Sequence, residues 1–180
     1  SRGIGVVDVD YGGSTGYGRA YRERLRGQWG IVDVEDTVAV MRALGDAGDA
    51  DPERLVIRGG SAGGWTTLAA LVAGDDFAAG IAYYPVADLV PFAEDTHEFE
   101  SRYLDGLIGP LPDALELYAE RSPLTHLDRL STPVLLLQGA DDRVVPPSQP
   151  ESVARRRGLA RPPALEDALA EVGRDAGARV

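Results

Sequence analysis

Apolar residues along this chain gather in short runs that alternate with helical patterns. Runs typical of buried strands occur at Ile4–Val9, Leu55–Ile57, Gly80–Tyr84 and Pro133–Gln138. Strands that alternate with helices favour a parallel sheet covered by helices, in which ligands bind beyond the carboxyl ends of the strands. The pattern therefore predicts an α/β fold with a mostly parallel, doubly wound sheet.

A surface helix is predicted between the first two runs. Asp33 is expected to be its N-cap, because Asp is a favoured capping residue and acidic residues follow in the first turn. Val34, Val38 and Met41 recur at helical spacing and form one apolar face. This helix should cover one face of the sheet.

The second apolar run leads directly into the most informative motif of the chain. The segment LVIRGGSAGG places Ser61 in a G-x-S-x-G turn between a strand and the helical pattern TTLAALVA. A serine on such a turn is strained, and side chains at Gly59 or Gly63 are expected to collide with the adjoining strand or helix. Ser61 is thus a candidate nucleophile; the alternative is a glycine-rich turn that only packs a helix on a strand.

A serine hydroxyl needs a general base, usually a histidine that is oriented by a carboxylate. Asp142 follows the last predicted strand, where the acid belongs in the order Ser, Asp, His, although it can also be a simple turn residue beside Asp141. No histidine follows Asp142. The two histidines, His97 and His126, precede it and are not expected to be the base.

Both histidines lie in a long excursion between two strands, from Ala87 to Arg129. This segment is acidic, aromatic and rich in turns, with short helices predicted near Glu98–Leu104 and Asp113–Glu120. It is expected to be an insertion over the site or a plain surface crossover.

Composition excludes several kinds of chemistry. A net charge of -11 argues against partners with phosphate backbones and anionic membrane surfaces. All 18 basic residues are arginine, which removes lysine-based mechanisms, and the absence of cysteine removes thiol catalysis and disulfides. No cofactor or metal site is expected, nor a membrane-spanning segment, and a cytoplasmic location is the default expectation.

Four blocks of the chain resemble successive blocks of the catalytic domain of the prolyl oligopeptidase family of serine peptidases. They are VDVDYGGSTGYGRAYR, RGGSAGGWTTL, DTHEFESRYLDGLIGP and PVLLLQGADDRVVPPSQ. The resemblance implies an α/β-hydrolase domain without a cofactor that cleaves short peptides. It assigns Ser61 as the nucleophile, Asp142 as the triad acid and the backbone N–H of Ala62 as an oxyanion donor.

The resemblance also implies what is missing. The family's H-G-G-P block lies upstream of Ile4, and its last strand with an E-G-x-x-H-G-F-like histidine loop is replaced here by an arginine- and alanine-rich stretch. We therefore expect a hydrolase sheet without its first strands and last strand, impaired activity, and self-association through the exposed edge at Pro133–Gln138.

The chain is accordingly expected to have two parts. Residues 1–150 are expected to form the partial hydrolase domain, and residues 151–180 a divergent tail that is either helical, with an amphipathic helix at Ala164–Val172, or disordered. The abrupt loss of resemblance near Pro150 leads to the hypothesis that the chain is a fragment whose reading frame changed there.

Two other functions remain open from the sequence. Gly12, Gly16 and Gly18 after a strand fit a dinucleotide-binding turn, although the absent lysine removes the usual reductase acid/base pair. A non-catalytic binding module that keeps the hydrolase scaffold is the second alternative, because a fold does not guarantee an activity.

Overall fold

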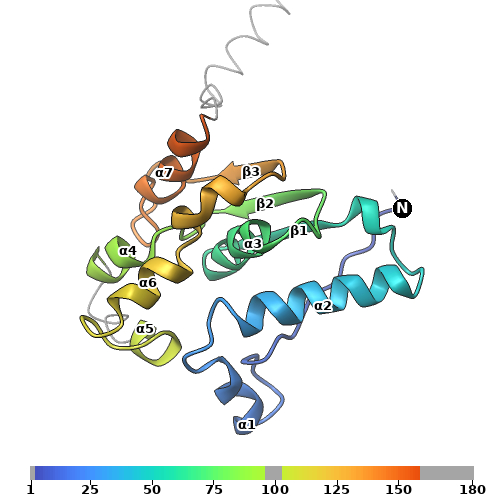
Figure 1. Cartoon of the computed structure of the whole chain (residues 1–180), viewed down its shortest axis with the longest axis horizontal. Helices are drawn as coiled ribbons and strands as arrows, with labels where there is room; N and C mark the ends of the chain where they lie inside the picture. Colours follow the sequence, from blue (N-terminus) through green and yellow to red (C-terminus); the bar gives the residue numbers. More distant parts are fainter. Residues whose placement is uncertain (1–2, 96–102, 159–180) are drawn as a thin grey trace, which may run out of the picture.

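The computed structural model describes residues 3–95 and 103–158 (Figure 1). Helices and strands alternate along most of this length, as the apolar pattern predicts. The elements are α1 (Arg19–Arg22), η1 (Glu23–Leu25), α2 (Val32–Asp46), η2 (Pro52–Arg54), β1 (Val56–Gly60), α3 (Ala62–Ala73), β2 (Ala79–Tyr83), α4 (Leu89–Asp95), α5 (Tyr103–Leu107), α6 (Leu115–Arg121), η3 (Pro123–Arg129), β3 (Val134–Leu137) and α7 (Ser148–Arg157).

The described strands form one parallel sheet in the order β1-β2-β3. In the register, Ile57 lies beside Gly80 and Gly80 beside Val134, while Arg58 lies beside Ile81 and Ile81 beside Leu135. All three strands therefore end at one edge of the sheet. This confirms the prediction of an α/β protein with parallel strands.

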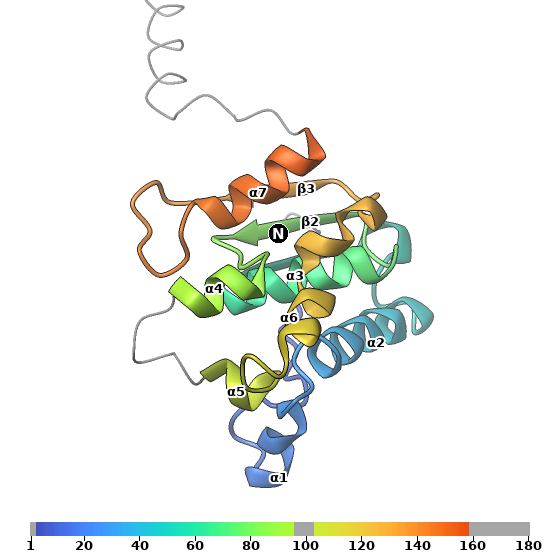
Figure 2. The ribbon, with the colours of Figure 1, turned by 60° about the vertical axis from the view of Figure 1, so that its left-hand side comes forward.

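One face of this sheet carries the hydrophobic core. Ile57 and Ala82 are buried there together with Leu68 and Leu71 of α3, and Val153 of α7 joins the same cluster. Figure 2 shows α3 and α7 on the same side of the sheet. Burial of this apolar face is the main term that holds the helices on the strands.

The opposite face of the sheet is more open in the described part of the chain. Val56 is 49 % exposed, Leu135 is 51 % exposed and Leu137 is 40 % exposed. These residues alternate with the core-facing ones, as successive side chains of a strand do. The face formed by Val56, Ile81, Tyr83, Leu135 and Leu137 is called the open sheet face below.

The predicted strand at Ile4–Val9 is wrong for this structure. The segment is irregular, and Ile4 and Val6 are 79 % and 75 % exposed. A strand exists only when a neighbouring strand supplies the other half of its hydrogen-bond ladder, and β1 pairs only with β2 among the described strands. The apolar run therefore has the composition of a strand without a partner.

Helix α2 confirms the predicted apolar face but corrects its N-terminus. Val34 is buried in the core, and Val38 and Met41 pack against it. The N-cap is Ile31 and not Asp33, which lies inside the first turn and is fully buried. The carboxylate reaches back to accept a hydrogen bond from the backbone N–H of Gly30 at 2.6 Å.

The excursion and the C-terminal region match the prediction unevenly. Helix α6 lies close to the predicted Asp113–Glu120, whereas most of the helix predicted near Glu98–Leu104 falls outside the described residues, and α5 overlaps only its end. His97 and the helix predicted at Ala164–Val172 also fall outside the described residues. Helix α7 runs through Pro150, and Val153 beyond it is fully buried. The division into residues 1–150 and 151–180 stays a prediction.

Candidate active site

Ser61 lies on a tight turn between β1 and α3. Its backbone has φ 54° and ψ -119°, a conformation that non-glycine residues rarely adopt, and its N–H donates to the carbonyl oxygen of Tyr83 on β2 at 3.0 Å. The side chain makes no capping bond to α3 and is half-buried. A strained, partly accessible hydroxyl at the end of a strand is the geometry predicted for the nucleophile turn.

Glycine is required at one of the two predicted positions. A Cβ on Gly59 would lie 2.2 Å from the carbonyl oxygen of Gly63, so the helix can start this close to the strand only if residue 59 has no side chain. A Cβ on Gly63 would meet nothing within 4 Å, so the predicted collision there is wrong. The second close approach is instead at Gly64, where an added Cβ would lie 3.0 Å from the Cα of Pro85.

Ala62 is the first residue of α3, and its side chain is exposed. The first four N–H groups of a helix have no partner within it and form the positive end of the helix dipole. The N–H of Ala62 therefore belongs to a group of donors suited to an oxyanion beside Ser61. Its role as an oxyanion donor stays a prediction.

Asp142 lies in the loop after β3, where the backbone holds its carboxylate. Oδ1 accepts from the N–H groups of Val144 at 2.9 Å and Val145 at 3.0 Å, and Oδ2 lies 3.4 Å from Nε2 of Gln138. These bonds to the charged form, chiefly from the two backbone N–H groups, lower the pKa of Asp142. The side chain is thus an ionised carboxylate of fixed orientation near neutral pH.

The lowered pKa of Asp142 predicts an effect on acid stability. Because the folded-state pKa lies below the ordinary value of about 3.9, the stabilisation is complete above that pH and is lost as the pH falls towards the lowered pKa. Asp142→Asn should therefore flatten the loss of unfolding free energy below about pH 4. Urea unfolding across this pH range, followed by far-UV circular dichroism, measures the effect.

Asp141→Asn is the matched control for this measurement, because Asp141 is adjacent and makes none of the bonds that hold Asp142. If the unfolding free energies of the Asp142 and Asp141 variants fall equally as the pH is lowered below about pH 4, the prediction is wrong.

The topology brings Ser61 and Asp142 to one edge of the sheet. Ser61 follows β1 and Asp142 follows β3, with β2 between them, so the two strand ends are offset by about 10 Å across the sheet. In a serine triad a histidine ring lies between the serine hydroxyl and the carboxylate.

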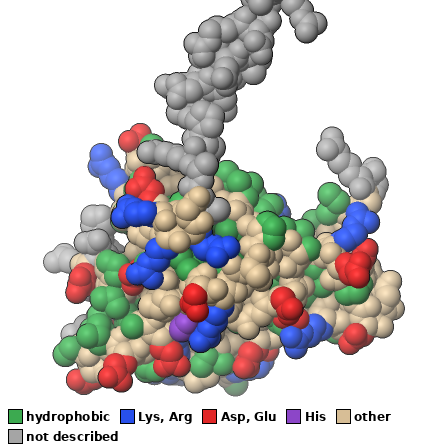
Figure 3. Space-filling model, turned by 45° about the horizontal axis from the view of Figure 1, so that its top comes forward, with side chains coloured by type: hydrophobic (Ala, Val, Ile, Leu, Met, Phe, Trp, Pro, Cys, Tyr) green, Lys and Arg blue, Asp and Glu red, His purple; other side chains and the backbone are tan. Residues whose placement is uncertain are grey.

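The described histidine is bonded within the excursion between β2 and β3. A ring nitrogen of His126 lies 2.6 Å from the carbonyl oxygen of Glu120 within the α6–η3 region. Figure 3 shows a histidine at the surface beside charged side chains. His97 lies outside the described residues. The sequence order and these contacts agree in not assigning His126 as the base.

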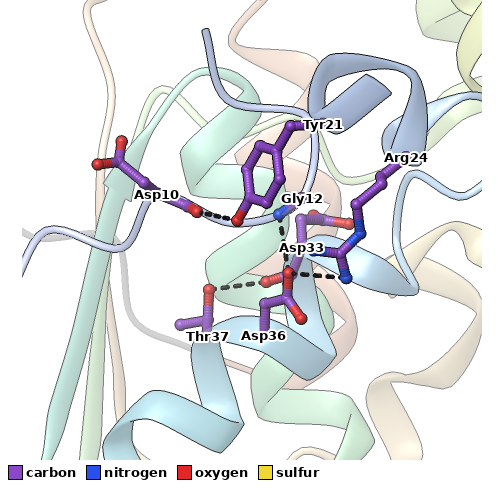
Figure 4. Close-up of polar contacts among 7 residues, drawn as sticks. All are labelled: Asp10, Gly12, Tyr21, Arg24, Asp33, Asp36 and Thr37. Carbon is purple, nitrogen blue, oxygen red and sulfur yellow. Dashed lines mark hydrogen bonds and ion pairs between the residues drawn. The ribbon is translucent and has the colours of Figure 1, made fainter. Parts of the chain in front are cut away.

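The glycine-rich turn near the N-terminus is bound to α2. The N–H of Gly12 donates to the carboxylate of Asp36 at 2.7 Å, Arg24 lies 3.7 Å from the same oxygen, and Tyr21 donates to the carbonyl oxygen of Asp10 at 2.7 Å (Figure 4). One backbone donor of this turn, the N–H of Gly12, is thus bonded to a carboxylate of the same chain. The preceding segment is also not a strand, so the dinucleotide-binding pattern lacks its structural context.

Sequence reasoning missed the contact between Asp33 and the helix that carries the site. Oδ2 of Asp33 accepts a hydrogen bond from Thr66 of α3 at 2.6 Å, deep in the interior. Burial raises the pKa of Asp33, while bonds from Thr66 and Gly30 oppose this shift. The helical pattern gave no signal for a buried acid, because Asp is far more common as an exposed cap.

A parallel sheet with a strained serine turn at the start of a helix, and an acidic loop after a later strand, defines the class of the α/β-hydrolases. The chain belongs to the prolyl oligopeptidase family, since the model of that family (Peptidase_S9) matches residues 1–157. This confirms the resemblance seen in the four sequence blocks. The chain is a member of a family of serine peptidases.

Individual relatives agree with this assignment. The chain is 31 % identical over 157 residues to the acylamino-acid-releasing enzyme of Arabidopsis thaliana, covering 81 % of this chain and 20 % of the relative. It is 28 % identical over 161 residues to dipeptidyl aminopeptidase BIII of Pseudoxanthomonas mexicana, covering 86 % and 23 %. A solved puromycin-hydrolyzing peptidase of Mycobacterium tuberculosis matches with a TM-score of 0.84 and 66 % identity, over 86 % of this chain and 24 % of that one.

The chain thus spans between 20 % and 24 % of the length of these relatives. Within residues 3–95 and 103–158, no helix is both long and apolar enough to cross a membrane. In the same ranges, no cluster of three or more His, Asp or Glu side chains is placed to hold a metal ion.

Proposed function

We propose that this chain is the nucleophile-bearing part of a serine peptidase, with Ser61 as nucleophile, Asp142 as triad acid and Ala62 as oxyanion donor. The observation that carries the proposal is the positive φ of Ser61 on a turn that only Gly59 permits, in a chain of a serine peptidase family. A serine in this backbone conformation costs about 1–3 kcal/mol of free energy, and such residues are typical of functional sites.

The proposed reaction is acyl transfer from an amide to serine and then to water. Oγ of Ser61 attacks the carbonyl carbon, the C–O bond forms, and the serine proton passes to a base. The negative charge on the former carbonyl oxygen is stabilised by backbone donors such as the N–H of Ala62. Collapse breaks the C–N bond, the amine leaves with the proton, and water then releases the acid from the serine ester.

The chain alone is proposed to perform this reaction slowly. No histidine follows Asp142 in the sequence, and His126 is bonded to the carbonyl oxygen of Glu120. A serine protease without one triad member still accelerates hydrolysis by roughly 10³ to 10⁴ over water, through its oxyanion site and binding. Weak reactivity at Ser61 is therefore expected, and not its complete absence.

Labelling with a fluorophosphonate probe tests this proposal. Mass spectrometry should find slow modification of Ser61 that is accelerated by free imidazole, because free imidazole can accept the serine proton as the base of a triad does. The Ser61→Ala variant should not react, and Asp142→Asn should respond less to imidazole.

Equal labelling of Ser61→Ala, or no labelling of the wild type with imidazole present, would refute the nucleophile. The second outcome would favour the alternative function, a non-catalytic binding module on the hydrolase scaffold. That alternative is kept because the chain lacks a histidine after Asp142.

The substrate class proposed is a short peptide or an aminoacyl amide. Relatives are named for the release of acylamino acids, for dipeptidyl aminopeptidase activity and for puromycin hydrolysis. A cytoplasmic location stays a prediction.

Self-association is proposed to occur through the β3 edge and the open sheet face beside it. Leu135 and Leu137 are exposed there, and β3 pairs only with β2 among the described strands. Unpaired apolar strands are templates for pairing with another chain. Sedimentation velocity should show concentration-dependent oligomers that Leu135→Glu reduces.

Leu115→Glu is the control for the sedimentation experiment, because Leu115 on α6 is 49 % exposed but lies off the sheet. A wild-type protein that remains a single monomeric species at high ionic strength, where charge repulsion between copies is screened, and that unfolds cooperatively would overturn the proposed self-association.

A further inference from the structure

The first turn of α3 packs against the segment that leads into α2 and against the first turn of α2. The rings of Trp29 and Trp65 are stacked with their centroids 4.2 Å apart and their planes 31° from parallel. Beside them, Asp33 accepts bonds from Thr66 and from the N–H of Gly30, both at 2.6 Å. Trp29, Gly30 and Asp33 on one side, with Trp65 and Thr66 on the other, are called the tryptophan–carboxylate clamp below.

The clamp is tightly fitted. Trp65 and Asp33 are fully buried and Trp29 is nearly so. Gly30 has φ +89°, and a Cβ at this position would lie 2.4 Å from Cη2 of Trp65. Any residue other than glycine would therefore push the indole of Trp65 away and open the contact.

A buried carboxylate is a poor choice for stability alone. Among the described residues Asp33 forms no ion pair, so its charge depends on hydrogen bonds, namely those from Thr66 and Gly30 and from the backbone N–H groups of Asp33 and Val34. An apolar pair of similar volume commonly stabilises a protein as well or better, whereas a carboxylate and a hydroxyl fix one relative orientation of two elements. The bond between the Asp33 carboxylate and the Thr66 hydroxyl is therefore better suited to fixing the orientation of α3 relative to α2 than to adding stability.

The element oriented by the clamp is the one that carries the site. Oγ1 of Thr66 lies 3.3 Å from the carbonyl oxygen of Ala62, in addition to its bond with Asp33. The N–H of Trp65 donates to the carbonyl oxygen of Ser61 at 3.0 Å. Trp65 is thus bonded to Ser61, and the Thr66 hydroxyl, whose one proton goes to Asp33, lies beside the carbonyl oxygen of Ala62.

We infer that Asp33 is a positioning residue, which through Thr66 fixes the rotation of the first turn of α3 and hence the directions of the Ser61 hydroxyl and the Ala62 N–H. It touches no substrate. This inference deepens the proposed function and rests on it for the roles of Ser61 and Ala62.

Amide hydrogen exchange and near-UV circular dichroism test the inference. Exchange is compared between peptides covering residues 61–66 and peptides covering β2, and the dichroism reports the stacked indoles, since Trp29 and Trp65 are the two tryptophans of the chain. The variants are Asp33→Asn, Thr66→Val and Thr66→Ser. The matched control is Thr67→Val, which removes a buried hydroxyl bonded to Gly63 within α3 and unconnected to Asp33.

Thr66→Val and Asp33→Asn should accelerate exchange at residues 61–66 about tenfold or more relative to β2, as expected for loss of a bond to a buried charged group. Both should also weaken the tryptophan signal, while Thr66→Ser and Thr67→Val should preserve the wild-type pattern. Equal acceleration in both segments, or failure of Thr66→Ser to restore the pattern, would overturn the inference.

The threonine variants decide the question even if Asp33→Asn does not fold. Exchange and dichroism are measured without catalysis, so an unreactive Ser61 in the probe experiment would count against the proposed function and not against the orientation of α3 by Asp33.

Discussion

Gly59→Ala is expected to destabilise the protein by more than about 4 kcal/mol, which is a large part of the total stability of a small domain. The added Cβ would lie 2.2 Å from the carbonyl oxygen of Gly63; the Cβ is fixed to the backbone of β1 and the oxygen is part of the backbone of α3, so neither atom can turn away. Relief requires α3 to move away from β1, which breaks the packing of Leu68 and Leu71 on the sheet. Urea unfolding followed by far-UV circular dichroism measures the loss.

Gly63→Ala is the matched control for this experiment. It adds the same methyl group four residues later, inside α3, where nothing lies within 4 Å. Alanine in a helix is favoured over glycine by about 0.5–1 kcal/mol, so this variant should be slightly more stable than the wild type. Similar losses for both glycine variants would show that the close approach at Gly59 does not determine the fold.

Trp65→Ala is expected to cost about 3–5 kcal/mol, the range measured for removal of a large aromatic side chain from a packed core. Trp65 is fully buried and stacks on Trp29, so its removal leaves a cavity below the first turn of α3. Thermal unfolding at constant pH gives the change in stability.

Trp65→Phe separates packing from polarity in the same position. The indole Nε1 of Trp65 is buried without a hydrogen-bond partner among the described residues, so phenylalanine removes an unsatisfied donor together with part of the ring. We expect a loss below about 1.5 kcal/mol, as for other changes that keep most of the apolar volume. A phenylalanine variant as unstable as the alanine variant would contradict this account.

The strands of the core were predictable from sequence because each signal was local. Val56–Gly60 and Ala79–Tyr83 combine apolar runs with nearby turn residues, and both were found within a few residues of the predicted bounds. Ile4–Val9 has an equally apolar composition but is irregular, because strand formation depends on a neighbour elsewhere in the chain. A single sequence contains the first kind of information and not the second.

The candidate site also has features that local sequence predicts and features that depend on packing between distant segments. Ser61 was predictable because the G-x-S-x-G turn is a property of one strand, one turn and one helix that are adjacent in sequence. The turn is found where the motif predicts it. The burial of Asp33 was not predictable, because it depends on how α2 meets α3, and an acid in the first turn of a helix favours the exposed interpretation. The collision expected at Gly63 failed for a similar reason, since the relative tilt of helix and strand places the contact at Gly64.

The open sheet face also makes the self-association of the protein depend on ionic strength. A net charge of -11 keeps copies apart in dilute buffer, while Leu135 and Leu137 favour their association. Added salt shortens the screening length from about 10 Å at 0.1 M to about 3 Å at 1 M, which removes the repulsion and leaves the apolar attraction in place. Storage and purification in low salt should therefore keep this acidic protein dispersed, and high-salt steps should precipitate it.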